Sequence, residues 1–278
     1  MEELSKHKSI LVSEIINFLE IKKDGNYLDG TFGGGGHSRA ILERLGPKGH
    51  LYALDRDPTA IRFAKTLKSK NFHFFPLSYL EVEDLEKQFD GAILDLGFST
   101  DQLYSSGRGF SHTKTDELLD LRYDANGGQS AWQFLNQASV SQIEKVFREY
   151  SEDRYAKHLA SKITASRREK AIKTVGDFVE IIGTSEPAVL SRLFQGLRIQ
   201  VNDELDHLKF GLREIKKCLK VGGVLAVISF HSIEDRIVKN FMKEQMKVVT
   251  KKPVTPTLQE IQVNPSSRSA KLRVSINL

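Results

Sequence analysis

Residues 26–39, which read NYLDGTFGGGGHSR, constrain the fold more than any other stretch of the chain. An apolar run ends at Leu28, Asp29 follows, and glycines stand at 30 and 33–36 before a segment with helical character. Glycines let the backbone approach a ligand closely, and the first N–H groups of a helix point at what binds there. We therefore expect a strand, a glycine turn and a helix to form a pocket for an anionic or polar ligand. A flexible linker is disfavoured, because an apolar strand and an amphipathic helix bound the glycines.

Strand-like and helix-like segments alternate over the first hundred residues. We expect helices at 9–19 and 36–45, a third helix capped by Asp57, and strands at 26–29, 50–54, 71–75 and 91–94. The strands are apolar throughout, which is typical of a parallel sheet covered by helices on both faces. Asp29, Asp55 and Asp95 each close one strand. Because ligands of such sheets bind beyond the carboxyl ends of the strands, we expect these acids to face one crevice.

The alternation stops near residue 107. Helix patterns at 131–135, 142–150, 153–165 and 175–182 then predict a helical insertion. The α/β pattern resumes with a helix at 202–219, a strand at 224–230, a helix at 232–246 and a last strand at 270–277, with a loop-like stretch at 247–267. We therefore predict a core of residues 1–106 and 192–278 with an inserted helical domain of residues 107–191.

Composition limits the classes of function. A single cysteine, Cys218, excludes an internal disulfide framework and a cysteine-based zinc site. The first ten residues contain no apolar signal segment, and the apolar run at 221–230 is too short to span a bilayer, so we expect a soluble cytoplasmic protein with no membrane partner. The net charge of +5 permits a nucleic-acid partner, and residues 236–278 hold nine Lys or Arg against two acids.

Asp29 ends the strand just before the glycines, unlike the usual arrangement of the dinucleotide fingerprint G-x-G-x-x-G. An acid followed by glycines at the end of a first strand is the pattern of S-adenosylmethionine-dependent methyltransferases. Asp55 could accept both ribose hydroxyls of either S-adenosylmethionine or NAD. An exocyclic base amine is a poor nucleophile, because its lone pair is delocalised into the ring. Asp95 is placed either to accept the N–H bonds of such an amine or to bind the amino group of a cofactor. His231 is either a substrate contact or a structural histidine, and Ser232 is the expected cap of the helix after it.

Eight longer motifs extend the pattern over nearly the whole chain. They are TFGGGGHS (31–38), LDRDP (54–58), LDLGFST-x-QL (94–103), RGFS (108–111), LDLRYD (119–124), FQGLRIQVNDEL (194–205), ISFHSIEDRIVK (228–239) and NPSSRSAKLRV (264–274). On these motifs the chain resembles the RsmH (MraW) family, bacterial methyltransferases of the small ribosomal subunit.

The resemblance implies an α/β fold of the class I S-adenosylmethionine-dependent methyltransferases, Rossmann-like, with a mostly parallel seven-stranded sheet and an inserted helical domain. It implies S-adenosyl-L-methionine as methyl donor, and as product an N4-methylated cytidine in the decoding centre (P site) of 16S rRNA. The partner would be 16S rRNA, within the small ribosomal subunit or as naked rRNA. We expect the helical insertion and the basic C-terminal segment to contact this RNA.

The matching motifs also imply roles for individual residues. Cofactor contacts would be Gly35, Gly36, His37, Asp55, Tyr79, Asp95 and Gln102. The residues expected to act in catalysis are Asp95, Ser99 and His231, and those expected to bind substrate are Arg108, Arg198, Asn202 and Arg268. Arg122 and Arg273 are further RNA candidates, although Arg122 could equally be a structural ion-pair partner. No metal ligand is expected. Cys218 is remote from the Asp95 motif, which favours direct methyl transfer over a covalent enzyme–base intermediate.

Several alternatives remain open at this stage. The chain departs from the family pattern at Leu118, Asp101 and His112, which affects the substrate side more than the cofactor side. The acceptor could be an amine on another nucleic acid. A nicotinamide-dependent dehydrogenase and a non-catalytic RNA-binding module are the competing functions, both disfavoured by the acids and glycines of the pocket. The sequence leaves open whether the protein forms a homodimer.

Overall fold

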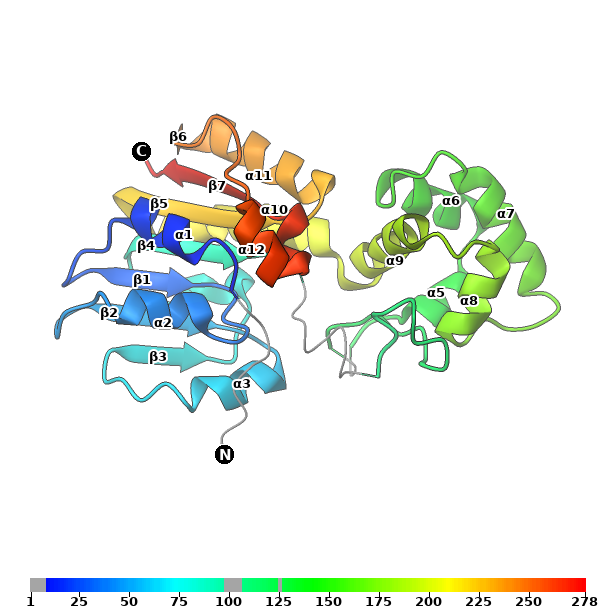
Figure 1. Cartoon of the computed structure of the whole chain (residues 1–278), viewed down its shortest axis with the longest axis horizontal. Helices are drawn as coiled ribbons and strands as arrows, with labels where there is room; N and C mark the ends of the chain where they lie inside the picture. Colours follow the sequence, from blue (N-terminus) through cyan, green and yellow to red (C-terminus); the bar gives the residue numbers. More distant parts are fainter. Residues whose placement is uncertain (1–8, 98–106, 125–126) are drawn as a thin grey trace. The chain divides into compact units, whose positions relative to one another are not determined.

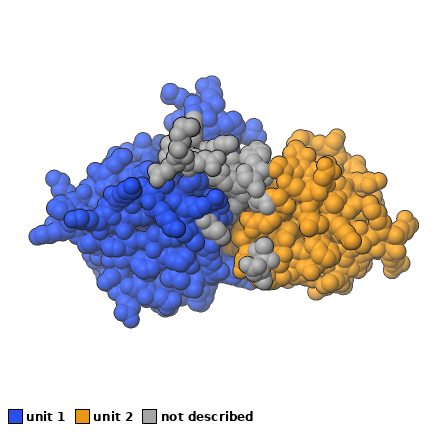
Figure 2. All heavy atoms as spheres, turned by 90° about the horizontal axis from the view of Figure 1, so that it is seen from below, with its two compact units in different colours: residues 1–99, 205–278 blue, residues 100–204 orange. Residues whose placement is uncertain are grey.

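The computed structural model describes residues 9–97, 107–124 and 127–278. They form two compact units, a sheet unit (residues 1–99 and 205–278) and a helical unit (residues 100–204). Figure 1 shows the elements of each unit, and Figure 2 shows how the chain divides between them. Ser99, Gln102 and Asp101, which the sequence singled out, lie outside the described residues.

The sheet unit is built on a seven-stranded sheet with the strand order β3-β2-β1-β4-β5-β7-β6. The strands are β1 Asn26–Asp29, β2 His50–Leu54, β3 Phe72–Phe75, β4 Phe89–Asp95, β5 Leu219–Ser229, β6 Lys247–Val248 and β7 Lys271–Ile276. Strands β1 to β5 are parallel, and β7 runs antiparallel to both β5 and β6. The expected mostly parallel α/β sheet is confirmed, and its strand order reverses direction between β1 and β4, where such sheets bind ligands.

Helices cover both faces of this sheet, because alternate strand residues point to opposite sides. Leu28, Leu94 and Val227 pack with α10 (Glu204–Cys218) and α11 (Ser232–Gln245). Their neighbours Tyr27, Ile93 and Ile228 pack on the other face with α1 (Val12–Leu19) and α2 (Gly36–Leu42). The remaining elements are α3 (Pro58–Ala64), α12 (Leu258–Val263) and the 3₁₀ helices η1 (Tyr79–Leu85) and η2 (Pro265–Ser269). The expected loop at 247–267 therefore contains both β6 and α12.

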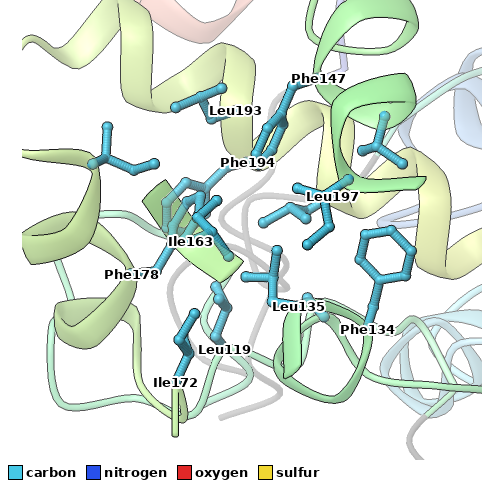
Figure 3. Close-up of a cluster of buried hydrophobic side chains, with 14 of the residues drawn as sticks. Leu119, Phe134, Leu135, Phe147, Ile163, Ile172, Phe178, Leu193, Phe194 and Leu197 are labelled. Carbon is cyan, nitrogen blue, oxygen red and sulfur yellow. The ribbon is translucent and has the colours of Figure 1, made fainter. Parts of the chain in front are cut away.

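The helical unit consists of α5 (Ala131–Gln137), α6 (Val140–Glu149), α7 (Ala156–Ser166), α8 (Val175–Ile182) and α9 (Pro187–Asn202). Side chains from all five helices form one apolar core, with Phe147, Phe178 and Phe194 at its centre (Figure 3). Ser130, Ser139 and Thr174 start three of the helices with reciprocal capping boxes. Among the described residues, no helix combines the length and apolar character needed to cross a membrane.

Because of helix α9, the inserted helical unit ends later in the chain than the sequence predicted. The sequence placed that boundary at residue 191, inside α9, but Leu193, Phe194 and Leu197 of this helix lie in the helical core. The unit therefore extends to Glu204. Gly196 in the middle of α9 weakened the helix pattern, because glycine costs about 1 kcal/mol in a helix interior. The structure tolerates it where the helix passes close to Ser151.

Candidate functional site

The carboxyl ends of the parallel strands bring the predicted acids to one edge of the sheet. Asp29 ends β1 and Asp95 ends β4, its neighbour in the sheet, while Asp55 directly follows β2 on the other side of β1. The backbone N–H of Asp95 donates to Thr31 Oγ1 at 2.6 Å, so the end of β4 is tied to the turn that follows β1. The site is thus anchored at the ends of three consecutive strands of the sheet, β2, β1 and β4.

The glycine turn is held in place by Asp55. Gly33 N–H donates to Asp55 Oδ2 at 2.8 Å, and Asp57 N–H donates to Asp55 Oδ1 at 2.9 Å. Gly33 and Gly35 have φ angles of 51° and 75°, a left-handed conformation that favours glycine. Burial raises the pKa of Asp55 to about 6, although the two backbone hydrogen bonds act to lower it. Each carboxylate oxygen keeps a second lone pair, so Asp55 can still accept hydroxyl groups of a ligand.

Asp29 has a structural role at the start of the turn. It is buried, accepting from Ser38 Oγ at 2.6 Å and from Thr31 N–H at 3.3 Å. Burial raises its pKa, partly opposed by the nearby His37 ring. Sequence reasoning missed Thr31 and Ser38, although both flank the glycines in TFGGGGHS and carry the hydroxyls that the buried acid and the end of β4 need.

His37 and Asp95 leave polar atoms without partners inside the site. His37 is 5% exposed, and within the described part of the chain neither of its ring nitrogens makes a hydrogen bond. Its Nε2 lies 3.5 Å from Asp95 Oδ2, and Asp95 Oδ1 is likewise buried without a partner among those residues. Buried polar atoms are nearly always hydrogen-bonded in native proteins. These atoms therefore fit a bound polar ligand, and a carboxylate oxygen suits the ammonium group of an amino-acid moiety.

Tyr79 lies between the end of β1 and α10. Its Cβ is 3.2 Å from the position that a Cβ on Gly30 would occupy, and a Cβ on Gly211 would collide with its ring. The ring also packs against the apolar cluster that contains Leu208 and Leu212 of α10. Two glycines thus set the position of an aromatic ring next to the glycine turn, where it can lie against a nucleobase.

His231 caps α11. Its Nδ1 accepts from the backbone N–H of Glu234 at 3.4 Å, and its Nε2 lies 3.1 Å from Glu234 Oε1, off the line of a good hydrogen bond. Glu234 Oε2 in turn accepts from Phe230 N–H at 2.9 Å. The cap is therefore His231, and the prediction of Ser232 is wrong. Because both ring nitrogens face Glu234, these contacts favour the structural role that the sequence left open.

The expected substrate residues of the helical unit have partners inside that unit. Arg198 is buried and forms a bidentate pair with Glu204, with distances of 2.7 and 2.9 Å. Arg108 donates to two backbone carbonyls, those of Arg122 and Tyr123. Asn202 donates to Leu121 O and accepts from Tyr123 N–H, at 2.8 Å in both cases. Asn202 thus ties the 121–123 segment to α9, Arg108 ties the same segment to the loop at residue 108, and Arg198 ties α9 to Glu204. These are structural roles.

The remaining expected RNA contacts divide into paired and exposed residues. Arg122 pairs with Asp120 at 2.6 Å, and the buried Arg273 pairs with Asp235 at 2.6 Å. Arg268 lies on η2 with its side chain exposed. Of these three residues, only Arg268 presents its guanidinium to solvent.

Comparison with known proteins gives the family. The model of the MraW methylase family matches residues 4–277. Ribosomal RNA small subunit methyltransferase H of Nitrosospira multiformis is 38% identical over 99% of this chain and 98% of its own length. An rRNA methylase from Streptococcus thermophilus aligns over 99% of both chains, with 11% identity and a TM-score of 0.48. The family match and the curated relative, spanning nearly the whole sequence, make the chain a member of the MraW methylase family.

Proposed function

We propose that this protein transfers a methyl group from S-adenosyl-L-methionine to the N4 amine of a cytidine in the decoding centre of 16S rRNA. The observation that carries the proposal is the pair His37 and Asp95, with its unpartnered buried atoms at the carboxyl edge of the sheet. Membership of a methylase family supports the reaction class. A curated relative named for the ribosomal RNA of the small subunit supports the substrate.

The donor site would combine three parts of the sheet edge. Asp55, fixed by Gly33 and Asp57, would accept the ribose hydroxyls. Tyr79 would lie against the adenine, and Asp95 Oδ1 would accept from the ammonium of the methionine moiety or from the substrate amine. Bound S-adenosylmethionine supplies a methyl group on a positively charged sulfur.

Asp95 has the chemistry that an exocyclic amine requires. A carboxylate that accepts an amine N–H localises the nitrogen lone pair, and it can take the proton that the methylated nitrogen must lose. The ring of His37 lies 3.5 Å from Asp95 Oδ2, and Oδ1, which has no partner among the described residues, would accept from the reacting amine. Cys218 is buried, and burial raises the pKa of its thiol, which argues against a cysteine nucleophile. We therefore propose direct transfer with no covalent enzyme–base intermediate.

The test is methylation in vitro with methyl-labelled S-adenosylmethionine, on small ribosomal subunits and on naked rRNA, followed by mass spectrometry of nucleosides. We expect label in N4-methylcytidine. Asp95→Ala should lower kcat by about 10²–10³-fold, the usual loss when a group that stabilises a transition state is removed. Label in a different nucleoside would refute the N4 assignment. A wild-type rate for Asp95→Ala would refute the role of Asp95.

A further inference from the structure

The positive charge of the chain is concentrated in one segment of the sheet unit. The sheet unit has 27 Lys and Arg against 21 Asp and Glu, whereas the helical unit has 14 against 15. Residues 236–252 alone hold six Lys and Arg against one acid, Glu244. Their excess of five equals the net charge of the whole chain, +5. The helical unit, which we expected to contact RNA, has no excess of positive charge.

This segment presents its basic side chains on the outer surface of α11 and the residues that follow it. Ile233, Val238 and Met242 form the buried face of the helix. Lys239 and Lys243 are four residues apart on the opposite, exposed face, where side chains at that spacing are neighbours. We define the basic strip as the exposed residues Arg236, Lys239, Lys243, Lys247, Lys251 and Lys252.

The central lysines of the basic strip are not neutralised by acids. Among the residues that the structure describes, Lys239, Lys243 and Lys247 form no ion pair. Asp235, four residues before Lys239, is held by Arg273 Nε at 2.6 Å and lies 3.9 Å from Lys271 Nζ. Glu244, next to Lys243, is exposed and likewise forms no ion pair among the described residues. Like charges at four-residue spacing repel one another. A row of phosphates would relieve this repulsion.

The basic strip begins at the edge of the sheet that carries Asp95. Strand β5 ends at Ser229, beside the end of β4, and α11 starts three residues later at Ser232. The helix then runs back along the sheet and leads into β6 (Figure 1). Its fourteen residues span about 21 Å. An RNA strand with its target base at that edge can therefore continue over the lysines of α11.

We propose that the basic strip binds the phosphate backbone of the RNA substrate next to the methylated nucleotide. This inference rests on the proposed function, because that function supplies the RNA. An anionic membrane is the less suitable occupant. Interfacial helices insert bulky apolar residues, whereas Val248 and Val249, 39% and 40% exposed, are the only large apolar residues exposed in the described segment 232–252.

The experiment compares two triple variants that remove the same charge. Lys239→Ala/Lys243→Ala/Lys247→Ala changes the basic strip. Lys65→Ala/Lys68→Ala/Lys70→Ala changes exposed lysines between α3 and β3, at the opposite end of the strand order from β6. Affinity for small ribosomal subunits and for naked rRNA is measured over a series of KCl concentrations. Affinity for S-adenosylmethionine is measured by calorimetry.

We expect the strip variant to reduce the slope of log K against log salt by about 2–3, because each lost phosphate contact removes about 0.7–0.9. The control variant should keep the wild-type slope, and all three proteins should bind S-adenosylmethionine equally. A strip variant with the wild-type slope overturns the inference. Loss of binding to phosphatidylserine vesicles with an unchanged RNA slope also overturns it. Failure of the wild-type protein to bind S-adenosylmethionine would instead refute the proposed function.

Discussion

The sheet unit and the helical unit treat their buried polar groups differently. Within the described residues, five buried side-chain atoms lack a hydrogen-bond partner, and four of them belong to His37, Asp95 and His231 of the sheet unit. In the helical unit, Arg198 and Asn202 have their polar groups engaged within the unit. The fifth atom, Ser151 Oγ, stands alone in the helical unit, whereas His37 and Asp95 contribute three atoms of neighbouring side chains. Among the described residues, the sheet unit therefore holds the cluster of unpartnered atoms that suits a ligand.

This comparison changes how the motif residues of the helical unit are interpreted. LDLRYD and FQGLRIQVNDEL look like substrate motifs, because they are rich in Arg, Asp and Asn. In the structure the two segments bind each other, with Tyr123 Oη and Arg198 both donating to Glu204 Oε1. A sequence motif can therefore mark an internal network as readily as a ligand site.

The largest effect is expected from Arg198→Met in the helical unit. Removing one partner of a buried ion pair leaves Glu204 uncompensated, which costs about 3–5 kcal/mol. Hydrogen exchange of the α9 amides should report the loss, while the affinity for S-adenosylmethionine stays at the wild-type value. The double variant Arg198→Met/Glu204→Leu should recover much of the stability. If Arg198→Met weakens binding of S-adenosylmethionine and leaves hydrogen exchange of the α9 amides unchanged, the distinction drawn between the two units is wrong.

A smaller effect is expected from Gly211→Ala in the sheet unit. The new Cβ collides with the ring of Tyr79, and overpacking of this kind costs about 1–3 kcal/mol. If Tyr79 lies against the adenine, the affinity for S-adenosylmethionine falls by about tenfold, roughly 1.4 kcal/mol. In a Tyr79→Ala background the same substitution should have no further effect on affinity. Equal weakening in both backgrounds would show that Gly211 acts independently of Tyr79.

An effect of similar size on affinity, but with no substitution and no packing cost, concerns pH. The folded-state pKa of Asp55 is raised from 3.8 to about 6, so the contribution of this group to stability is present below pH 3.8 and is lost as the pH rises through 6. Ribose hydroxyls need the ionised carboxylate, which has the opposite dependence. We expect the affinity for S-adenosylmethionine to fall by about tenfold between pH 7 and pH 5. Calorimetry at both pH values checks this, and equal affinities would remove Asp55 from the ribose site.

The sequence predicted the sheet well because its signals are local. Apolar runs closed by Asp29, Asp55 and Asp95 locate three strand ends, and the parallel arrangement then brings them to one edge. The contact of Tyr79 with Gly211 carries no such signal, because 132 residues separate them and only the tertiary fold brings them together. The pairing of Arg198 with Glu204 was missed for a related reason: α9 was not expected, so the two residues had no defined geometry.

A crystal structure of the protein with S-adenosylhomocysteine tests the central claim most directly. The claim is that the unpartnered atoms at the sheet edge belong to the methyl-donor site. We expect the ligand to lie over the glycine turn, with Asp55 bound to the ribose and Asp95 Oδ1 bound to a donor group of the ligand. A ligand bound elsewhere, or one bound at this edge that leaves both His37 and Asp95 without partners, would contradict the account.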